Sequence, residues 1–335
     1  MKKVTITDVA QVAGVSVSTV SHALSGKRPI STKVKSTILE AVESLGYRPS
    51  LSAQVIRGGR TMVIAAMVDD LQKGSTSVTL EAFHRALSMH GYDLAVYICG
   101  RGAHHGVEML KNLSVGMLDG IINLQPDISL RQAELAAGNI PIITYLRPHP
   151  DSPVCIDIEA GVTRSLNYLW DLGHRRIGFI GGIRIKSPEM PKDPQLAAYE
   201  AFMAERDYLE PALAHMSEGL FADGIALADV LWQAGSTAVL AANDVVAAGV
   251  FSWAKSQKLS VPGDISVIGH DDSELSKMLT PTLTTVQFPY QEVAEITCDA
   301  LLNLIAGKHV AQHRRIRPAL IVRDSTGIPN PNRRS

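Results

Sequence analysis

Apolar residues recur at helical spacing along the start of the chain, and this pattern predicts three short helices. We expect them over residues 8–13, 17–24 and 32–45. Each has before it a hydroxyl residue able to cap it, namely Thr7, Ser16 and Ser31. Gly14 and Gly46 are placed to end the first and third helices. The apolar faces supply one small core, made of Ala10, Val15, Val20, Leu24, Val34, Ile38 and Leu45.

From residue 61 the pattern changes to apolar strands alternating with amphipathic helices. The predicted strands cover residues 62–68, 94–99, 120–124, 141–146, 176–180, 238–242 and 265–269. Helices are predicted over residues 79–90, 160–172, 196–207 and 245–257. Buried strands joined by helices are typical of parallel, doubly wound α/β sheets. About ten or more strands are too many for one sheet of this length, so we expect two lobes.

The pattern therefore predicts an all-α head followed by a two-lobed α/β body. The head is expected over residues 1–49 and the body over 61–327, with lobe boundaries near 160 and again near 288. Residues 50–60 hold one or two weakly apolar turns before Gly58–Gly59, which predicts a linker whose short helix is marginal alone. Residues 328–335 are expected to be a frayed tail.

The near-neutral net charge of −1 conceals an asymmetry between head and body. Residues 1–60 hold nine basic and three acidic residues, a net charge of +6, and the remainder holds 23 basic and 30 acidic residues, a net charge of −7. A basic head on an acidic body indicates either a partner that is a polyanion or a solvated basic face.

The expected location is the cytoplasm. The chain has no apolar run long enough to span a membrane, and no apolar stretch follows the first two lysines, so neither a membrane span nor a secretory signal is expected. Cys99, Cys155 and Cys298 are far apart and lie in apolar runs, which indicates reduced, buried thiols. No metal site and no cofactor is expected, and the adjacent pair His104–His105 indicates a solvated loop rather than a metal site.

Residues 5–24 fit a helix-turn-helix with a glycine-containing turn. Such a unit places its second helix in the major groove of DNA, with the N-terminal side chains against base edges. Val20 and Leu24 face the core, so the expected base-reading residues are Val17, Ser18 and His22. The expected contacts to the DNA backbone are Thr5, Ser16, Thr19, Ser21 and Lys33.

Several stretches, in order, resemble the lactose-repressor/galactose-repressor (LacI/GalR) family over nearly the whole chain. The first is the sequence DVAQVAGVSVSTVS at residues 8–21. The later ones are Ala242-Asn243-Asp244, the run VPGDISVIGHDD at residues 261–272, and PTLTTV at residues 281–286.

The resemblance implies a homodimer that binds a near-palindromic operator through two major-groove helices. It also implies that the linker forms hinge helices only on DNA, with Ile56 wedged into the minor groove; the alternative is that Ile56 is a buried packing residue. Relatives that form tetramers carry an extra C-terminal helix, and without a heptad tail a dimer is expected here.

Position 22 is commonly Arg in relatives, and His lacks the guanidinium fork that pairs with guanine. The preferred half-site is therefore expected to differ, unless His22 contacts only phosphate. Val17 is placed to meet a thymine methyl group. Other basic residues are expected to set affinity and its salt dependence, namely Lys2, Lys3, Lys33, Lys35 and Arg57.

The body is similar to a periplasmic sugar-binding protein, as the family's body is. The resemblance implies effector contacts from Asn243 and Asp271, each at the end of a predicted strand. The carry-over is weaker for Asp70, Tyr145, Asp157 and Phe288. Arg147 faces either the cleft or the solvent, and Phe288 is either a stacking floor or ordinary core.

Two departures put the family's usual neutral sugar in doubt. Gln195 stands where the family has an arginine that holds the effector, one residue before a helix. The first cleft loop carries residues 73–76, KGST, instead of aromatic residues. Arg147, Lys186 and Lys192 would together suit an anionic effector such as a sugar acid or phosphate.

The expected function is therefore a sequence-specific DNA-binding repressor of a carbohydrate catabolism or uptake operon, controlled by a small sugar-like effector. The alternative is a binding protein of the periplasmic type without a role on DNA. Enzyme activity is not expected, because the chain has no phosphate-binding G-x-x-x-x-G-K-[ST] or G-x-G-x-x-G motif and no G-x-S-x-G elbow.

Overall fold

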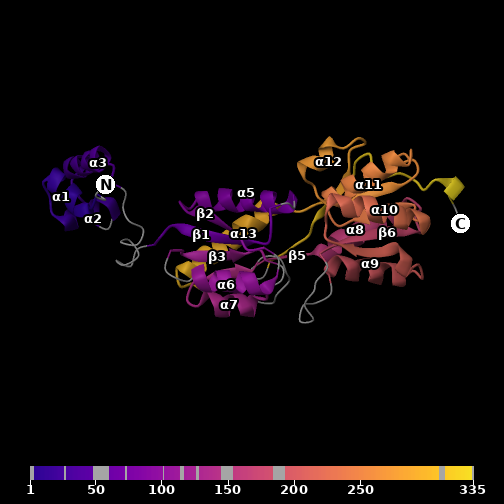
Figure 1. The fold of residues 1–335 in the computed structure, drawn as a ribbon, viewed down its shortest axis with the longest axis horizontal. Coiled ribbons are helices and arrows are strands. Elements are labelled where there is room, and N and C mark those ends of the chain that lie inside the picture. Colours follow the sequence, from indigo (N-terminus) through magenta and orange to yellow (C-terminus); the bar gives the residue numbers. More distant parts are fainter. Residues whose placement is uncertain are drawn as a thin grey trace. The chain divides into compact units, whose positions relative to one another are not determined.

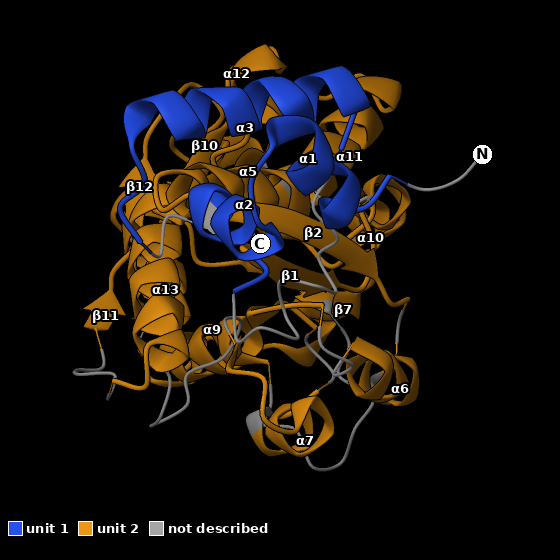
Figure 2. Ribbon diagram, turned by 90° about the vertical axis from the view of Figure 1, so that its left-hand side faces the viewer, with its two compact units in different colours: residues 1–61 blue, residues 62–335 orange. Residues whose placement is uncertain are grey.

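A computed structural model of the chain divides into two compact units, Met1–Thr61 and Met62–Ser335 (Figure 1; coloured separately in Figure 2). The structure describes residues 4–25, 28–47, 60–71, 74–100, 102–113, 117–125, 128–144, 154–183, 193–308 and 314–333. Within these ranges no helix combines the length and apolar character that a bilayer span requires.

The first unit consists of three helices, α1 (Ile6–Ala13), α2 (Val17–Ser25) and α3 (Thr32–Leu45). The predicted ranges for α2 and α3 are confirmed to within a residue. The first helix starts earlier than predicted, and its N-cap is Thr5, not Thr7. The reason is Asp8, which accepts hydrogen bonds from both the backbone N–H and the hydroxyl of Thr5, at 2.7 Å each.

All seven predicted core residues of this unit pack into one cluster, together with Val9, Ala13, Ala41 and Tyr47. Val9, Val20 and Ile38 are fully buried, one from each helix. Because each helix contributes to the same core, the surface of α2 that faces solvent is fixed by the burial of Val20.

The second unit opens with a four-stranded parallel sheet of order β2-β1-β3-β4. Its strands are β1 (Val63–Val68), β2 (Asp93–Ile98), β3 (Gly120–Asn123) and β4 (Ile142–Thr144). One face is covered by α5 (Gly74–Ser88) and α13 (Tyr290–Ile305). The other is covered by α6 (Ala103–Leu113) and α7 (Leu130–Ala137). The sheet is thus wound on both faces, as predicted.

A second sheet of six strands has the order β12-β10-β9-β8-β6-β7, and only β12 runs antiparallel. Its strands are β6 (Ile177–Ile183), β7 (Ala214–Ser217), β8 (Ala238–Ala241), β9 (Ser266–Asp271), β10 (Thr284–Gln287) and β12 (Ala319–Ile321). Helices α8 (Ile158–Asp171) and α9 (Pro194–Ala204) cover one face, and α10 (Phe221–Gln233) and α11 (Asp244–Ser256) the other. The short helix α12 (Glu274–Met278) follows β9, and two 3-10 turns lie at Pro211–Leu213 and Pro331–Arg333.

The chain passes between the two sheets three times. It leaves the first sheet after β4, returns to it as α13 after β10, and leaves again before β12. The first and third crossings contain β5 (Val154–Ile156) and β11 (Arg314–Ile316), which pair in parallel. The two lobes are therefore joined by three connecting segments, an arrangement suited to a hinge.

Three expectations about this unit need correction. Helix α5 begins at Gly74, so residues 74–76 belong to a helix and not to a cleft loop. Helix α9 begins at Pro194, capped by Asp193, so Gln195 lies inside its first turn and not before it. Near the C-terminus, the side chain of Asn330 donates to Asp264, so part of the expected frayed tail is held against the body.

Two of the three cysteines, Cys99 and Cys298, are free and buried. Burial raises the pKa of both thiols, that of Cys298 to about 12, which keeps them protonated and inert. The side chain of Cys155 lies outside the described residues.

Candidate functional site

The N-terminal turn of α2 presents small polar groups to solvent. Val17 is 40% exposed and Ser18 is also exposed, while Thr19, Ser21 and His22 are half-buried. These exposed and half-buried residues include the three predicted to read bases. An α-helix with such a face suits insertion of its first turn into a groove of DNA.

Ser16 caps this helix. Its Oγ accepts a hydrogen bond from the backbone N–H of Thr19 at 3.1 Å and lies 2.8 Å from the hydroxyl oxygens of both Ser18 and Thr19. The three hydroxyls therefore form one cluster at the helix start. Ser16 fixes the direction of the turn as well as offering a hydroxyl to a phosphate.

The other backbone-contact candidates lie on neighbouring helices. Thr5 is exposed, but it is the N-cap of α1 and its hydroxyl already donates to Asp8. Lys33 and Lys35 are exposed in the first turn of α3. Several predicted residues lie outside the described residues, so their roles stay predictions, namely Lys2, Lys3, Ile56, Arg57, Tyr145, Arg147, Lys186 and Lys192.

In the second sheet, polar side chains gather at the carboxyl ends of the parallel strands. Asn243 follows β8 and caps α11, with its Oδ1 accepting from the N–H of Val246 at 2.8 Å. Its amide nitrogen donates to the carbonyl of Gly219 at 3.1 Å. Both ends of this side chain are thus used within the fold, and an effector would have to share or displace one of these bonds.

Asp271 ends β9 and lies in the left-handed region, with φ of 104°. Its Oδ1 accepts a hydrogen bond from the hydroxyl of Tyr290 at 2.9 Å. Desolvation, with a smaller contribution from the charge of Asp244, raises the pKa of Asp271 to about 7. A carboxyl group in an unfavourable backbone conformation, with a pKa near neutrality, is a candidate for a ligand contact.

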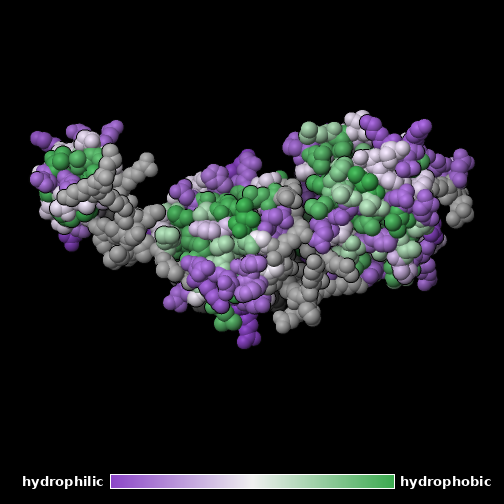
Figure 3. Space-filling model, in the orientation of Figure 1, coloured by the Kyte–Doolittle hydropathy of each residue, from purple (hydrophilic) through white to green (hydrophobic). Residues whose placement is uncertain are grey.

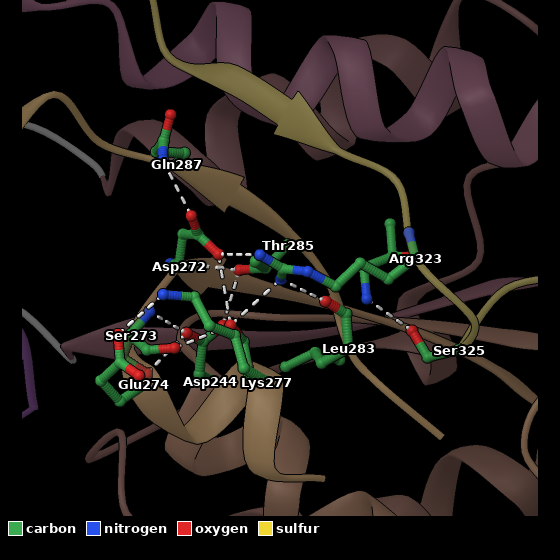
Figure 4. Close-up of polar contacts among 12 residues, drawn as sticks. Asp244, Asp272, Ser273, Glu274, Lys277, Leu283, Thr285, Gln287, Arg323 and Ser325 are labelled. Atoms are coloured by element: carbon green, nitrogen blue, oxygen red, sulfur yellow. Dashed lines mark hydrogen bonds and ion pairs between the residues drawn. The ribbon is translucent and has the colours of Figure 1, made fainter. Parts of the chain in front are cut away.

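A buried network fixes the turn after β9 (Figure 4). Asp244 accepts from the N–H and hydroxyl of Ser273 at 2.7 Å each, and from the hydroxyl of Thr285 at 2.6 Å. Burial raises the pKa of Asp244 to about 6 although these hydrogen bonds lower it. The three residues join the starts of α11 and α12 to β10.

Asp272 extends this network. Its carboxylate pairs with Arg323 at 2.5 Å and accepts from the amide of Gln287 at 2.8 Å (Figure 4). Arg323 also donates to the carbonyl of Leu283. Asp272, like Asp271, has a positive φ, of 51°. The network thus holds two consecutive aspartates in a turn that their intrinsic preferences disfavour.

Aromatic rings line the same end of the sheet. The ring centroid of Phe288 lies 6.1 Å from that of His270 and 6.0 Å from that of Tyr290. Phe288 is half-buried, so it contributes to a wall beside Asp271 and is not sealed in the core. Gln195 reaches this region from α9 and donates to the carbonyl of Ala242 at 3.5 Å.

Two of the weaker candidates do not join this group. Asp70 is half-buried after β1, in the first sheet. Asp157 caps α8 by accepting from the N–H of Ala160 at 3.0 Å, and its Oδ2 lies 2.9 Å from Nε of Arg315 and 3.7 Å from Nε of Arg317. Asp157 is 6% exposed. Its contacts to Arg315 and Arg317 give it a structural role at the crossing between the lobes.

The sequence reasoning missed Tyr290, His270, Asp244 and Arg323 at this site. A weak signal existed for Asp244 and His270, since both lie within stretches that carried the family resemblance. Nothing local marks Tyr290 or Arg323, because their partners are 19 and 51 residues away along the chain. Among the residues that the structure describes, no group of three or more His, Cys, Asp or Glu side chains is placed to hold a metal ion.

Comparison with known proteins matches both units. Residues 5–50 match the family model of bacterial regulatory proteins of the lacI family, and residues 166–326 match that of a periplasmic binding protein-like domain. The HTH-type transcriptional repressor CytR of Escherichia coli (strain K12) is 28% identical over 340 residues, which cover 96% of this chain and 96% of that protein.

Two further relatives are similar over the whole length. The ribose operon repressor of Escherichia coli (strain K12) is 29% identical over 334 residues, covering 96% of this chain and 99% of that protein. The crystal structure of the lac repressor dimer bound to operator and the anti-inducer ONPF superposes with a TM-score of 0.85 at 26% identity, covering 97% of this chain and 100% of that chain.

Proposed function

Because this chain belongs to the lacI family of bacterial regulatory proteins, we propose that it is a cytoplasmic repressor of a carbohydrate operon, controlled by a small sugar-like effector. The observation that carries the proposal is the pairing of two features in one chain. One is a helix whose exposed first turn suits a DNA groove, and the other is a two-sheet body with polar groups at its strand ends. The chain is a regulator and not an enzyme.

Operator recognition is assigned to α2. Val17, Ser18 and His22 would contact base edges, with Ser16, Thr19 and Ser21 beside them on the phosphates. Thr5 and Lys33 would add backbone contacts from α1 and α3. Ile56 would act as the minor-groove wedge, as the family resemblance implies.

The effector is assigned to the carboxyl ends of the strands in the second sheet, where ligands of open α/β sheets bind. Asp271 is the principal acceptor for its hydroxyl groups, with Phe288 as an apolar wall. Gln195 and Asn243 lie at the same end, each with a carbonyl partner that an effector could replace. Tyr145, Arg147 and Asp70 would contribute from the first lobe.

The partner in solution is a second copy of the chain. Exposed apolar residues of the body support this, because a monomer rarely leaves such a surface in water (Figure 3). On the first lobe they are Val78 of α5 with Val96 and Ile98 of β2, an edge strand. On the second lobe they are Leu220, Phe221, Ile225 and Met278.

Coupling follows from the triple crossing between lobes. An effector that contacts both lobes binds one arrangement of the hinge better than the other, and only that difference in affinity shifts the equilibrium. Operator binding must then change effector affinity by the same factor. Asp157 lies at this hinge, where its ion pairs with Arg315 and Arg317 join α8 to the returning strand.

Operator selection from random duplex DNA with the full-length protein tests the proposal. Enrichment of a near-palindromic site, with binding altered by a neutral or phosphorylated sugar, is the expected result. A variant that lacks residues 1–60 should lose operator binding and keep its ligand. A full-length protein that prefers no symmetric duplex over random DNA would leave the alternative, a binding protein without a role on DNA.

A further inference from the structure

Within the part of the chain that the structure describes, His270 has a buried acceptor atom without a hydrogen-bond partner. Its side chain is 1% exposed at the carboxyl end of β9, and among the described residues no group lies within hydrogen-bonding distance of Nε2. The other ring nitrogen, Nδ1, lies 3.1 Å from the carbonyl oxygen of Ala241. A carbonyl can only accept, so Nδ1 carries the proton and Nε2 of the neutral ring keeps a free lone pair.

Protonation does not relieve this atom. Burial lowers the pKa of His270 to about 4, so the ring stays neutral at physiological pH. Native proteins rarely keep a buried acceptor without a donor, because its lost hydration is not repaid. A buried acceptor of this kind calls for a role that the isolated fold does not supply.

The position of the ring indicates that role. His270 precedes Asp271, the carboxyl group assigned to the effector, and its ring lies against Phe288 of the aromatic wall. Gln195 binds the carbonyl of Ala242, the neighbour of the residue whose carbonyl His270 holds. The imidazole therefore lies against Phe288 and next to Asp271 in the sequence, at the end of the sheet that the proposed function assigns to the effector.

We propose that Nε2 of His270 accepts a hydrogen bond from a hydroxyl or N–H group of the effector and so selects for a donor at that point. The proposal rests on the proposed function, which places the effector at this end of the sheet. It makes His270 a specificity-determining residue that the family resemblance did not assign.

The chemistry of Nε2 restricts the effector. In the neutral ring this atom accepts and does not donate, so an ionised phosphate or carboxylate oxygen placed against it would meet another lone pair. An uncharged hydroxyl or N–H group satisfies it. This end of the site therefore favours the neutral part of an effector, and any anionic group would have to lie elsewhere.

Two substitutions separate the two ring nitrogens. His270→Asn keeps a donor near the position of Nδ1, so the bond to Ala241 is retained, but it places no atom at Nε2. His270→Gln carries its carbonyl oxygen to about the position of Nε2 and loses the Nδ1 donor. A structural role for His270 would favour the Asn variant, whereas the proposed role in binding favours the Gln variant.

The ligand is identified by thermal-shift screening of the full-length wild type. The screen contains neutral pentoses, hexoses, disaccharides and nucleosides, and their phosphates. Calorimetry then compares the hit and its monodeoxy analogues across the three proteins. We expect binding to fall roughly 10- to 100-fold in His270→Asn and to change less than about threefold in His270→Gln. The wild type should bind one deoxy analogue more weakly than the hit. His270→Asn should bind that analogue and the hit with similar affinity.

Equal binding by His270→Asn and the wild type would overturn the proposal. So would a wild type that tolerates every deoxy analogue, or one that responds to no neutral member of the screen. The wild-type comparison of analogues needs no variant and remains decisive if a variant fails to fold. Operator selection with the same preparations tests the proposed function separately, since loss of specific DNA binding with intact discrimination of analogues contradicts that function alone.

Discussion

Arg323 and Asp272 form a shielded ion pair, with Nη2 and Oδ1 2.5 Å apart and with side chains only 17% and 7% exposed. The pair joins the returning C-terminal segment to the turn after β9. Removal of one partner from such a pair leaves a buried charge without compensation.

We therefore expect Arg323→Ala to lower the free energy of unfolding by about 3 kcal/mol. Chemical denaturation monitored by circular dichroism measures this change. The matched control is Arg85→Ala, which breaks an exposed i,i+4 pair with Glu81 and should cost less than about 0.5 kcal/mol. Similar decreases in the free energy of unfolding for Arg323→Ala and Arg85→Ala would contradict the idea that burial of the ion pair makes its loss more costly.

Effector affinity should depend on pH through Asp271. Because the pKa of this carboxyl group is raised to about 7, it accepts hydrogen bonds at full strength only above that pH. Asp244, with a pKa of about 6, titrates at the lower limit of the tested range, and His270, with a pKa of about 4, titrates below it. Calorimetry from pH 6 to pH 8 should show affinity rising with pH in the wild type and rising much less in Asp271→Asn.

His22→Ala should relax base preference at one symmetric position of the operator. The expected loss of discrimination is about 1 kcal/mol at that position. Lys33→Ala is the control, and it should weaken binding to all sequences alike and reduce the salt slope. If selection returns the same site for His22→Ala as for the wild type, His22 contacts only phosphate.

His174 should make the stability of the body depend on pH. It is 1% exposed, and its ring nitrogens lie within hydrogen-bonding distance of Thr237, Ser266 and the carbonyl of Gly327. Burial lowers its pKa to about 4. Between pH 6.5, the ordinary pKa, and pH 4, this histidine is protonated in the unfolded chain but not in the native state. The free energy of unfolding therefore falls as the pH falls through this window.

This contribution amounts to about 3 kcal/mol over the window. Asp244 and Asp271, with raised pKa values, act in the opposite direction, so a difference measurement isolates His174. The stability that His174→Gln loses relative to the wild type should be largest at pH 7 and should shrink toward pH 4. A difference that does not vary with pH would exclude a neutral buried imidazole.

Ile98→Glu should weaken the dimer. Ile98 is 54% exposed on the edge strand β2, beside the exposed Val96, and a carboxylate there would have to be buried without a partner. Sedimentation velocity should show monomer for this variant where the wild type is dimeric. Leu135→Glu is the control, because Leu135 is exposed on α7, which covers one face of the first sheet. Dissociation by the control and not by Ile98→Glu would place the interface elsewhere.

Local features of the fold could be predicted from the sequence. The core of the first unit, the bounds of α2 and α3, all strands of the first sheet and β6, β8 and β9 of the second follow from periodicity and capping, which act within a few residues. The short strands β7, β10 and β12 were not among the predicted strands. The incorrect prediction of Thr7 as the N-cap of the first helix also has a local cause. Asp8 lies three residues after Thr5 and accepts a hydrogen bond from its backbone N–H, which favours a helix that starts after Thr5. The core-facing side of α2, which carries Val20 and Leu24, was predictable for the same reason.

The polar side chains that meet at the site come together through the tertiary fold. Tyr290 reaches Asp271 across 19 residues, Thr285 reaches Asp244 across 41, and Arg323 reaches Asp272 across 51. Helix α13 packs on the first sheet although it directly follows β10 of the second sheet in sequence. Hydrophobic periodicity records which face of a strand is buried but not the order of strands in a sheet, and that order brings the ends of distant strands together.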